Sequence, residues 1–286
     1  MILAGMGRSG TTWAARLINY DQSYRILFEP FCPWVTREAR RFEYMQYINP
    51  RCHNPILVNQ AKKILSGRPR NYWVDGENEK IIYRRRIIKD IRANLMLGWL
   101  KKIMPQMPIV LMIRHPLAVT ASWLHLGWGK ELRGKRSEFS ILTSQKALLN
   151  DFPLISEVIE IIDQKSLFEQ ILFQWCVFYY VPFRTLMKHD SFLLFYENLI
   201  LEPEHELKRL FQYLRQPYNW QAIHKISRKS SSTNYLKRDF NKDRTQLLSG
   251  WKARFSEAQI QRARTILAMF ELEHVYDVNG YPAKPS

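Results

Sequence analysis

The first residues of the chain form a glycine-rich segment with the composition of a phosphate-binding loop. A short apolar run at residues 1–4 leads into Gly-Met-Gly-Arg-Ser-Gly-Thr-Thr at residues 5–12, and a helical pattern follows at residues 13–18. A strand, a glycine loop and a helix in this order direct backbone N–H groups and a helix N-terminus at a phosphate. The segment therefore predicts a site for a phosphorylated ligand. The residues expected to hold it are Gly7, Arg8, Ser9, Gly10, Thr11 and Thr12.

This loop differs from the ATP- and GTP-binding loop in the place of its cation. The spacing from Gly5 to Gly10 fits the pattern G-x-x-x-x-G-K-[ST], but Thr11 stands where the lysine would reach the β- and γ-phosphates. A cation appears earlier instead, at Arg8, which favours a ligand with a shorter anionic group. The glycines also fit part of the dinucleotide fingerprint, for which Glu29 would be the ribose-binding acid. Both alternatives stay open at this point.

A second candidate anion site lies in the middle of the chain. Residues 109–113 form a continuous apolar run that is typical of a buried parallel strand, and the run ends in Arg114. A helical pattern begins at Pro116, so Ser122 lies two turns into a helix. Because open α/β sheets bind ligands at the carboxyl ends of their strands, Arg114 and Ser122 are expected to share an anion. The alternative is that Arg114 pairs with a sheet carboxylate and Ser122 only packs.

Together the two motifs resemble the sulfotransferases that use 3′-phosphoadenylyl sulfate (PAPS), in particular their carbohydrate-acting and bacterial members. The likeness rests on Gly-Arg-Ser-Gly-Thr-Thr-Trp at residues 7–13 and on an arginine followed eight positions later by a serine. In that family the first motif binds the 5′-phosphosulfate of the donor, and the arginine and serine bind its 3′-phosphate. The usual loop cation of the family is lysine. Arg8 keeps that charge but not its shape.

Looser similarities extend the resemblance over most of the chain. Tyr196 matches a family tyrosine that lies near the adenine, and Trp13 is a second candidate for stacking on that base. Residues 28–31 and 250–252 also look like family segments. The basic segment 227–233 is similar to a late loop that closes on the 3′-phosphate in relatives. The residues matched there are Arg228 and Lys229.

The resemblance implies transfer of a sulfuryl group from PAPS to an acceptor hydroxyl or amine, with 3′,5′-adenosine bisphosphate (PAP) as the second product. By analogy with phosphoryl transfer, positioning and charge stabilisation supply most of the catalysis. Cations aimed at the leaving phosphate lower the barrier. Arg8 is one candidate, and Lys89, at the end of an expected strand, is the other. Lys89 is equally compatible with a solvated residue in the basic stretch 83–92.

The expected general base is Glu29. It follows an apolar run at residues 24–28, so it also stands at the carboxyl end of a strand, and its apolar neighbours are expected to raise the pKa of its carboxyl. Other family members use a histidine in a Lys-Thr-His context, where this chain has Lys89 and Asp90. Asp90 is therefore the reserve candidate. Either acid is also compatible with a helix cap or an ion pair.

The net charge and the spacing of histidines and cysteines indicate which partners and ligands to expect. The 286 residues include 43 Lys and Arg against 26 Asp and Glu, a net charge of +17, which attracts anions. We expect a carbohydrate acceptor, and the positive charge favours an acidic polysaccharide. The same charge would also allow peripheral contact with a membrane surface. Residues 84–86 and 225–229 are candidate basic patches or solvated faces. No nucleic acid is expected. No metal is expected either, since the chemistry requires none and the histidines and cysteines lack ligand spacing.

The pattern along the chain predicts an α/β fold in a single domain over residues 1–286. Apolar runs alternate with helical patterns, which indicates a central parallel sheet flanked by helices on both faces, a P-loop-like three-layer sandwich. Segments 32–70 and 128–152 are expected to be insertions, the first lining the acceptor cleft and the second forming a mobile loop over it. The expected strands are 2–4, 24–28, 87–89, 109–113 and 192–195. The expected helices are 12–19, 94–103, 117–126, 166–188, 204–214 and 257–271.

The location expected from these features is the cytoplasm. The phosphate motif begins at residue 5, which leaves no room for a signal peptide, and no apolar run approaches 18 residues. Three cysteines without a pairing pattern fit a reducing compartment. An N-terminal anchor ahead of the first residue stays an alternative.

Two other function classes stay open. A P-loop kinase or NTPase would share the glycine loop, although the lysine and an obvious Mg²⁺-binding acid at a strand end are missing. A non-catalytic polyanion-binding protein would account for the charge of +17. Mg²⁺-dependent ATP turnover would favour the kinase, and salt-dependent polyanion binding without transfer would favour the binding protein.

Overall fold

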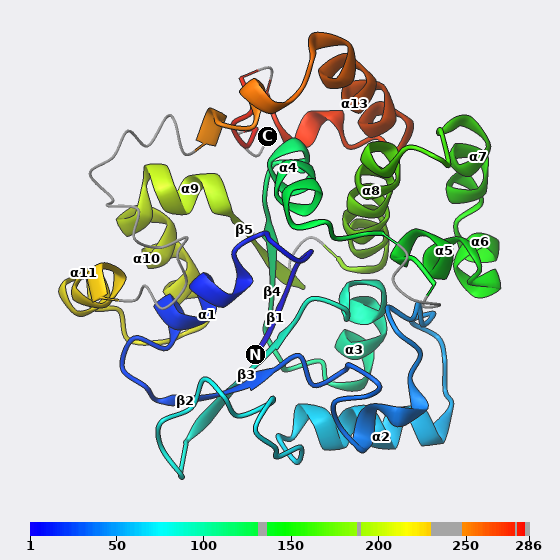
Figure 1. Cartoon of the computed structure of the whole chain (residues 1–286). Helices are drawn as coiled ribbons and strands as arrows, with labels where there is room; N and C mark the ends of the chain where they lie inside the picture. The colour runs from blue at the N-terminus through cyan, green and yellow to red at the C-terminus, as the bar shows by residue number, and fades with distance from the viewer. Residues whose placement is uncertain (131–135, 188–189, 230–247, 278, 284–286) are drawn as a thin grey trace.

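A five-stranded parallel sheet forms the centre of the molecule (Figure 1). The structure is a computed structural model that describes residues 1–130, 136–187, 190–229, 248–277 and 279–283, without the side chains of 225–229. The sheet order is β2-β3-β1-β4-β5, and all paired strands are parallel. The strands are β1 (Ile2–Ala4), β2 (Tyr24–Phe28), β3 (Arg85–Asp90), β4 (Ile109–Ile113) and β5 (Ser191–Phe195).

Helices cover both faces of this sheet, with α1, α9, α10 and α11 on one side and α3, α4, α8 and α13 on the other (Figure 1). Those on the first side are α1 (Thr11–Ile18), α9 (Tyr196–Leu201), α10 (Pro203–Tyr213) and α11 (Trp220–Lys229). Those on the second side are α3 (Leu97–Ile103), α4 (Pro116–Leu126), α8 (Leu167–Thr185) and α13 (Glu257–Met269). The other helices in the described residues are α2 (Pro55–Leu65), α5 (Glu138–Thr143), α6 (Lys146–Asp151) and α7 (Pro153–Ile161). The 3₁₀ turns there are η1 (Glu38–Arg41), η2 (Asn94–Met96), η3 (Lys252–Arg254) and η4 (Glu273–Val275).

Each face of the sheet has its own hydrophobic core, because side chains alternate along a strand. In β4, Ile109, Leu111 and Ile113 pack in the cluster that includes α8, whereas Val110 and Met112 pack in the cluster of α1 and α10. All five β4 residues are buried. Burial on both faces explains why this strand is a continuous apolar run without alternation.

The predicted α/β fold and all five predicted strands are confirmed. The expected helix at 94–103 is divided into η2 and α3, and the one at 166–188 ends at Thr185. The segment 32–70 contains α2. The expectation of a loop throughout 128–152 is wrong, because α5 and α6 lie in it. The helix α5 packs against α8, and α6 packs against α5 and α7. Helices of six residues have too few turns to show a clear period.

Candidate functional site

Predicted site residues from four strands meet at the carboxyl end of the sheet. The parallel register places Phe28 beside Lys89, and β1 lies between β3 and β4. The glycine loop after β1, Glu29 after β2, Lys89 in β3 and Arg114 after β4 therefore emerge at the same edge. Open α/β sheets hold their ligands at this edge.

The glycine loop turns sharply into α1. Gly10 directly precedes α1 with a φ of +96°, and Arg8 in the loop has a φ of +73°. A Cβ at Gly10 would lie 2.9 Å from Met112 Cε and 2.9 Å from Tyr196 Cδ2, so glycine suits this position in both conformation and space. Within the described part of the chain, no side chain caps α1. Its first amides can therefore serve an anion.

A buried tyrosine supports the loop from below. Tyr179 in α8 accepts a hydrogen bond from the Met6 amide at 3.2 Å and donates one to the main chain of β4 at 2.9 Å. The Oγ of Ser9 lies 3.1 Å from the same phenol oxygen and is buried, so this hydroxyl faces the interior. Thr11 and Thr12 form the first turn of α1. The loop is thus fixed by its contacts with α8 and β4.

The two predicted anion sites are joined into one group of side chains. Arg8 Nε donates to Ser122 Oγ at 3.1 Å, and Arg114 Nη1 donates to the Arg8 carbonyl at 3.0 Å. The Arg114 guanidinium lies 4.3 Å from the centroid of the Tyr196 ring. Tyr196 in turn meets Trp13 edge-on, with ring centroids 5.7 Å apart. All five of these residues were predicted from the sequence as site residues. Arg114 contacts a main-chain carbonyl and an aromatic ring.

Glu29 is buried between two cations. Its Oε1 accepts a hydrogen bond from Lys89 Nζ at 2.7 Å, and its Oε2 accepts one from Arg92. Burial acts to raise the pKa of Glu29, but the charges and hydrogen bonds of Lys89 and Arg92 outweigh it and hold that pKa below its usual value. The expected upward shift is therefore wrong. Lys89 is also buried, and burial lowers its pKa, so the solvated alternative for Lys89 is excluded.

The reserve candidate, Asp90, ties two strand ends together. It is buried, and its two carboxylate oxygens accept hydrogen bonds from the Phe31 amide at 2.9 Å and the Arg92 amide at 2.8 Å. Burial raises the pKa of Asp90 to about 6. These bonds connect the turn after β2 to the end of β3, and so hold Glu29 beside Lys89.

Three further residues at the site could not be predicted from the sequence. Arg92 follows Asp90 by two positions, in a stretch where several basic residues make no single one stand out. Trp128 lies 5.8 Å from the guanidinium carbon of Arg8, measured from its ring centroid. Tyr179 stands in the middle of an apolar helix, where an aromatic residue gives no signal of function.

An aromatic pair extends the site outward from Arg92. The guanidinium carbon of Arg92 lies 5.2 Å from the Tyr44 ring centroid, and Tyr44 stacks on Trp34 with centroids 4.9 Å apart. The Tyr44 hydroxyl donates to Glu138 at 2.8 Å, which fixes the ring. Trp34 is 68% exposed, so it offers aromatic surface at the outer end of the contacts that run from Glu29 through Arg92 and Tyr44.

The late Trp-Lys segment packs behind Arg114. Trp251 stacks on His115 with ring centroids 4.2 Å apart. The His115 amide donates to Glu197 at 2.9 Å, and the Tyr276 hydroxyl donates to the other oxygen of Glu197 at 3.0 Å. Burial, with neighbouring cations, lowers the pKa of His115 to about 3. His115 is therefore neutral and supports the strand end on which Arg114 stands.

The predicted late basic loop is described only in part. Residues 227–229 form the end of α11, so the expectation of a loop there is wrong. The side chains of Arg228 and Lys229, and the whole of 230–233, lie outside the described residues. Their predicted contact with a 3′-phosphate stays a prediction.

The described ranges of the chain hold no group of three or more His, Cys, Asp or Glu side chains that could bind a metal ion. None of the helices in them is long and apolar enough to cross a membrane.

Comparison with known families finds one match over almost the whole chain. The family model described as the sulfotransferase domain matches residues 1–277. No curated protein sequence matches the chain.

Several solved structures share the fold. The sulfotransferase domain of the olefin synthase from Synechococcus PCC 7002 aligns with 92% of this chain and 92% of its own, at 15% identity and a TM-score of 0.51. Mouse sulfotransferase SULT7A1, solved in complex with PAP, aligns with 97% of this chain and 86% of its own, at 16% identity and a TM-score of 0.51. Sulfotransferase STF9 from Mycobacterium avium aligns with 99% of this chain and 78% of its own, at 12% identity and a TM-score of 0.50.

Proposed function

The chain belongs to the sulfotransferase family, and we propose that it transfers a sulfuryl group from PAPS to a hydroxyl of a carbohydrate. The observation that carries the choice of donor is the linked group of Arg8, Ser122 and Arg114 beside the N-terminus of α1. Two cations joined through one loop suit a ligand with two separate anionic ends. PAPS has a 5′-phosphosulfate and a 3′-phosphate, and mouse SULT7A1, which has this fold, was solved with PAP.

In this proposal the donor spans the loop and the strand end beside it. The loop amides and Arg8 bind the 5′-phosphosulfate, because a helix N-terminus and a cation both stabilise that charge. Arg114 and Ser122 bind the 3′-phosphate. Tyr196 and Trp13 supply aromatic surface for the adenine. Arg228 and Lys229 are proposed as further 3′-phosphate ligands on the resemblance alone.

The proposed chemistry uses the buried ion pair of Glu29, which follows β2, and Lys89, which lies in β3. The acceptor oxygen forms a bond to sulfur while the bond between sulfur and the phosphate oxygen of the donor breaks, and PAP leaves. Glu29 takes the acceptor proton, and Lys89 and Arg8 stabilise the charge that develops on the leaving phosphate. The low pKa of Glu29 keeps its carboxylate ionised and able to accept a proton. Asp90 acts as a positioning residue through its bonds to Phe31 and Arg92.

The choice of a carbohydrate acceptor is supported by the exposed aromatic pair. Sugar rings pack on flat aromatic faces, and Trp34 and Tyr44 offer such a surface beside Arg92. The charge of +17 suits an acidic polysaccharide. The test is an assay of ³⁵S transfer from labelled PAPS to a panel of neutral and acidic oligosaccharides, phenols and peptide tyrosines. Transfer to sugars supports the whole proposal, and transfer only to phenols or peptides overturns the acceptor class while leaving the donor intact.

A further inference from the structure

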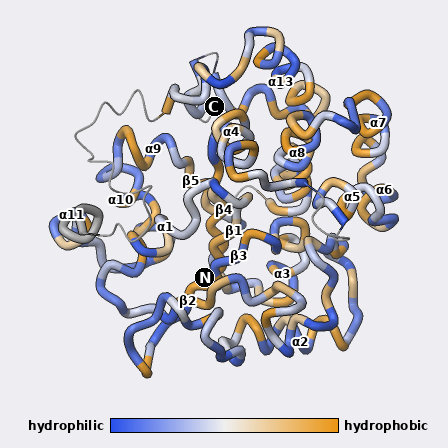
Figure 2. The backbone as a smooth tube through the Cα atoms, viewed as in Figure 1, coloured by the Kyte–Doolittle hydropathy of each residue, from blue (hydrophilic) through white to orange (hydrophobic). Residues whose placement is uncertain are grey.

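The loop that enters β3 exposes large apolar side chains. Ile81 is 89% exposed and Ile82 is 84% exposed, and Tyr72 on the neighbouring segment is 90% exposed. Figure 1 shows this loop projecting below the β2 edge of the sheet, and Figure 2 shows a hydrophobic tip between hydrophilic arms. Large apolar side chains that are exposed together and flanked by polar residues mark an interaction surface.

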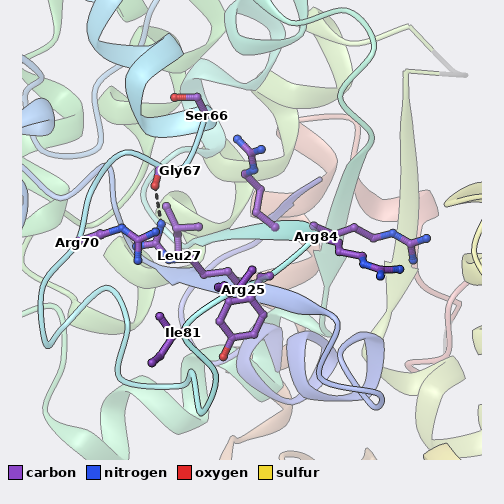
Figure 3. Close-up of a pocket in the computed structure, with 11 residues that line it drawn as sticks. Arg25, Leu27, Ser66, Gly67, Arg70, Ile81 and Arg84 are labelled. Carbon is purple, nitrogen blue, oxygen red and sulfur yellow. Dashed lines mark hydrogen bonds between the residues drawn. The ribbon is translucent and has the colours of Figure 1, made fainter.

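Arginines surround the same loop. A cavity of about 220 Å³ lies between it and the end of α2 (Figure 3). Within the described residues, Arg70, Arg84 and Arg85 are exposed and take part in no ion pair. The residues that line the cavity include Arg25, Gly67, Arg70, Ile81, Arg84 and Arg86.

Basic residues outnumber acids in this part of the chain, so the surface carries a net positive charge. The segment 68–86 contains six Lys and Arg residues and three acids. Two of those acids are paired, Asp75 with Arg25 at 2.7 Å and Glu77 with Arg16 at 2.8 Å. Arg25 also donates to the Gly67 carbonyl at 2.5 Å, which closes the inner wall of the cavity (Figure 3). The third acid is Glu79, which accepts a hydrogen bond from Gln22.

This surface lies at the opposite end of the strands from the donor site. Arg85 begins β3 and pairs in register with Tyr24 at the start of β2, whereas Lys89 and Glu29 lie at the other ends of these strands. A partner bound at the amino end would therefore leave the carboxyl end of the sheet open.

We propose that this surface docks the protein on an anionic lipid bilayer. Ile81 and Ile82 insert below the headgroups, Tyr72 lies at the interface, and the arginines around the cavity contact lipid phosphates. Apolar tips flanked by cations and an aromatic side chain have this chemistry, since the apolar part enters the bilayer while the charge stays at its anionic surface. A soluble polyanion would use the arginines but would leave Ile81 and Ile82 exposed to water.

The experiment is sedimentation of the whole protein with vesicles of pure phosphatidylcholine and with vesicles that contain phosphatidylglycerol. Binding is expected only to the anionic vesicles and should weaken as salt is added. Each arginine near such a surface is worth about fivefold, so Arg70→Gln with Arg84→Gln and Arg85→Gln should weaken binding by roughly 100-fold. Ile81→Ser with Ile82→Ser, which changes no charge, should weaken it by about 10-fold or more.

Matched controls remove the same kinds of groups elsewhere. Lys146→Gln with Lys208→Gln and Arg264→Gln deletes three exposed charges on α6, α10 and α13. Ile56→Ser removes another exposed isoleucine. Both controls should bind anionic vesicles nearly as well as the wild type. The proposal is overturned if the wild-type protein does not bind anionic vesicles, or if the control triple variant loses as much vesicle affinity as the arginine triple variant. It is also overturned if the isoleucine variant binds both vesicles and heparin normally, because the surface would then be assigned to a soluble polyanion.

Discussion

Glu29 and Lys89 are hydrogen-bonded through both their backbones and their side chains. The Glu29 amide donates to the Lys89 carbonyl at 2.7 Å, and Lys89 Nζ donates to Glu29 Oε1 at 2.7 Å. Glu29 has a φ of +50°, a left-handed conformation that turns the chain out of β2 at this point. The acid and the cation are thus held as one unit at the sheet edge. In the proposed reaction the same unit supplies the base and a stabilising charge.

Replacing the proposed base tests that reaction. Glu29→Gln keeps the shape of the side chain but removes its capacity to take a proton, so turnover should fall by about 10²–10⁴-fold. PAP binding should change little, because the loop and Arg114 are untouched. Glu169→Gln is the control, since Glu169 is a carboxylate paired with Arg262 away from the site. Wild-type turnover in the Glu29 variant would move the base elsewhere.

The pH dependence distinguishes the two candidate acids. The pKa of Glu29 lies below its usual value, so Glu29 stays ionised and turnover should be level as the pH falls from 7 to 5. Asp90 has a pKa of about 6, so turnover would fall below that pH if Asp90 were the base. At alkaline pH, turnover should fall before the usual lysine range, because burial lowers the pKa of Lys89 and its charge is lost earlier. The measurement is kcat from pH 5 to 10 at saturating PAPS.

Truncating the strand-end arginine tests recognition of the donor. Arg114→Ala should weaken PAP binding by roughly 10- to 100-fold, the value of charge-assisted hydrogen bonds. Binding of 5′-AMP, which lacks the 3′-phosphate, should change much less. Arg184→Ala is a close control, because Arg184 also lies over a tyrosine ring, at 5.2 Å from Tyr180. Equal losses for PAP and 5′-AMP would assign Arg114 to another part of the nucleotide.

The tight loop turn can be tested with a pair of glycines. Gly10 and Gly127 both have positive φ, +96° and +67°, but a Cβ at Gly127 meets nothing within 4 Å. Gly127→Ala should therefore lose only about 1 kcal/mol of unfolding free energy, from backbone strain. Gly10→Ala should lose more, and it should also weaken PAP binding because Tyr196 must move. Equal stability of the two variants in urea unfolding would show that the contact at Gly10 is relaxed without strain.

The exposed tryptophan tests the acceptor class. Trp34→Ala should raise KM for an oligosaccharide acceptor by about 3–10-fold and leave PAP binding unchanged. Trp34→Phe should restore part of the loss, since a ring is kept. An unchanged KM in the alanine variant would place the acceptor away from the Trp34–Tyr44 pair.

The fold could be predicted from the sequence where buried elements appear as apolar runs. Residues 109–113 are apolar without interruption because β4 is buried on both faces, and the short strand β1 shows the same pattern. The strands β2, β3 and β5 combine a shorter apolar run with polar or charged residues. The short helices α5 and α6 lack such a signal, because six residues cover less than two turns and show no clear period.

The site could be predicted where a residue type and its neighbours in sequence carry the chemistry. Arg8, Arg114 and Ser122 were found in this way, and the structure brings them into contact. The direction of the Glu29 pKa shift could not be predicted, because it depends on Lys89 and Arg92. These residues lie 60 and 63 positions away in the sequence and are brought close by the pairing of β2 and β3. A local pattern of apolar neighbours therefore gave the wrong direction.

The measurement that tests the account most directly is a calorimetric titration of the wild-type protein with PAP in the presence of EDTA. Parallel titrations use 5′-AMP, and ATP with Mg²⁺. The account predicts that PAP binds without Mg²⁺ and far more tightly than 5′-AMP, because the 3′-phosphate contributes through Arg114 and Ser122. Preference for ATP with Mg²⁺, or equal binding of PAP and 5′-AMP, would contradict it.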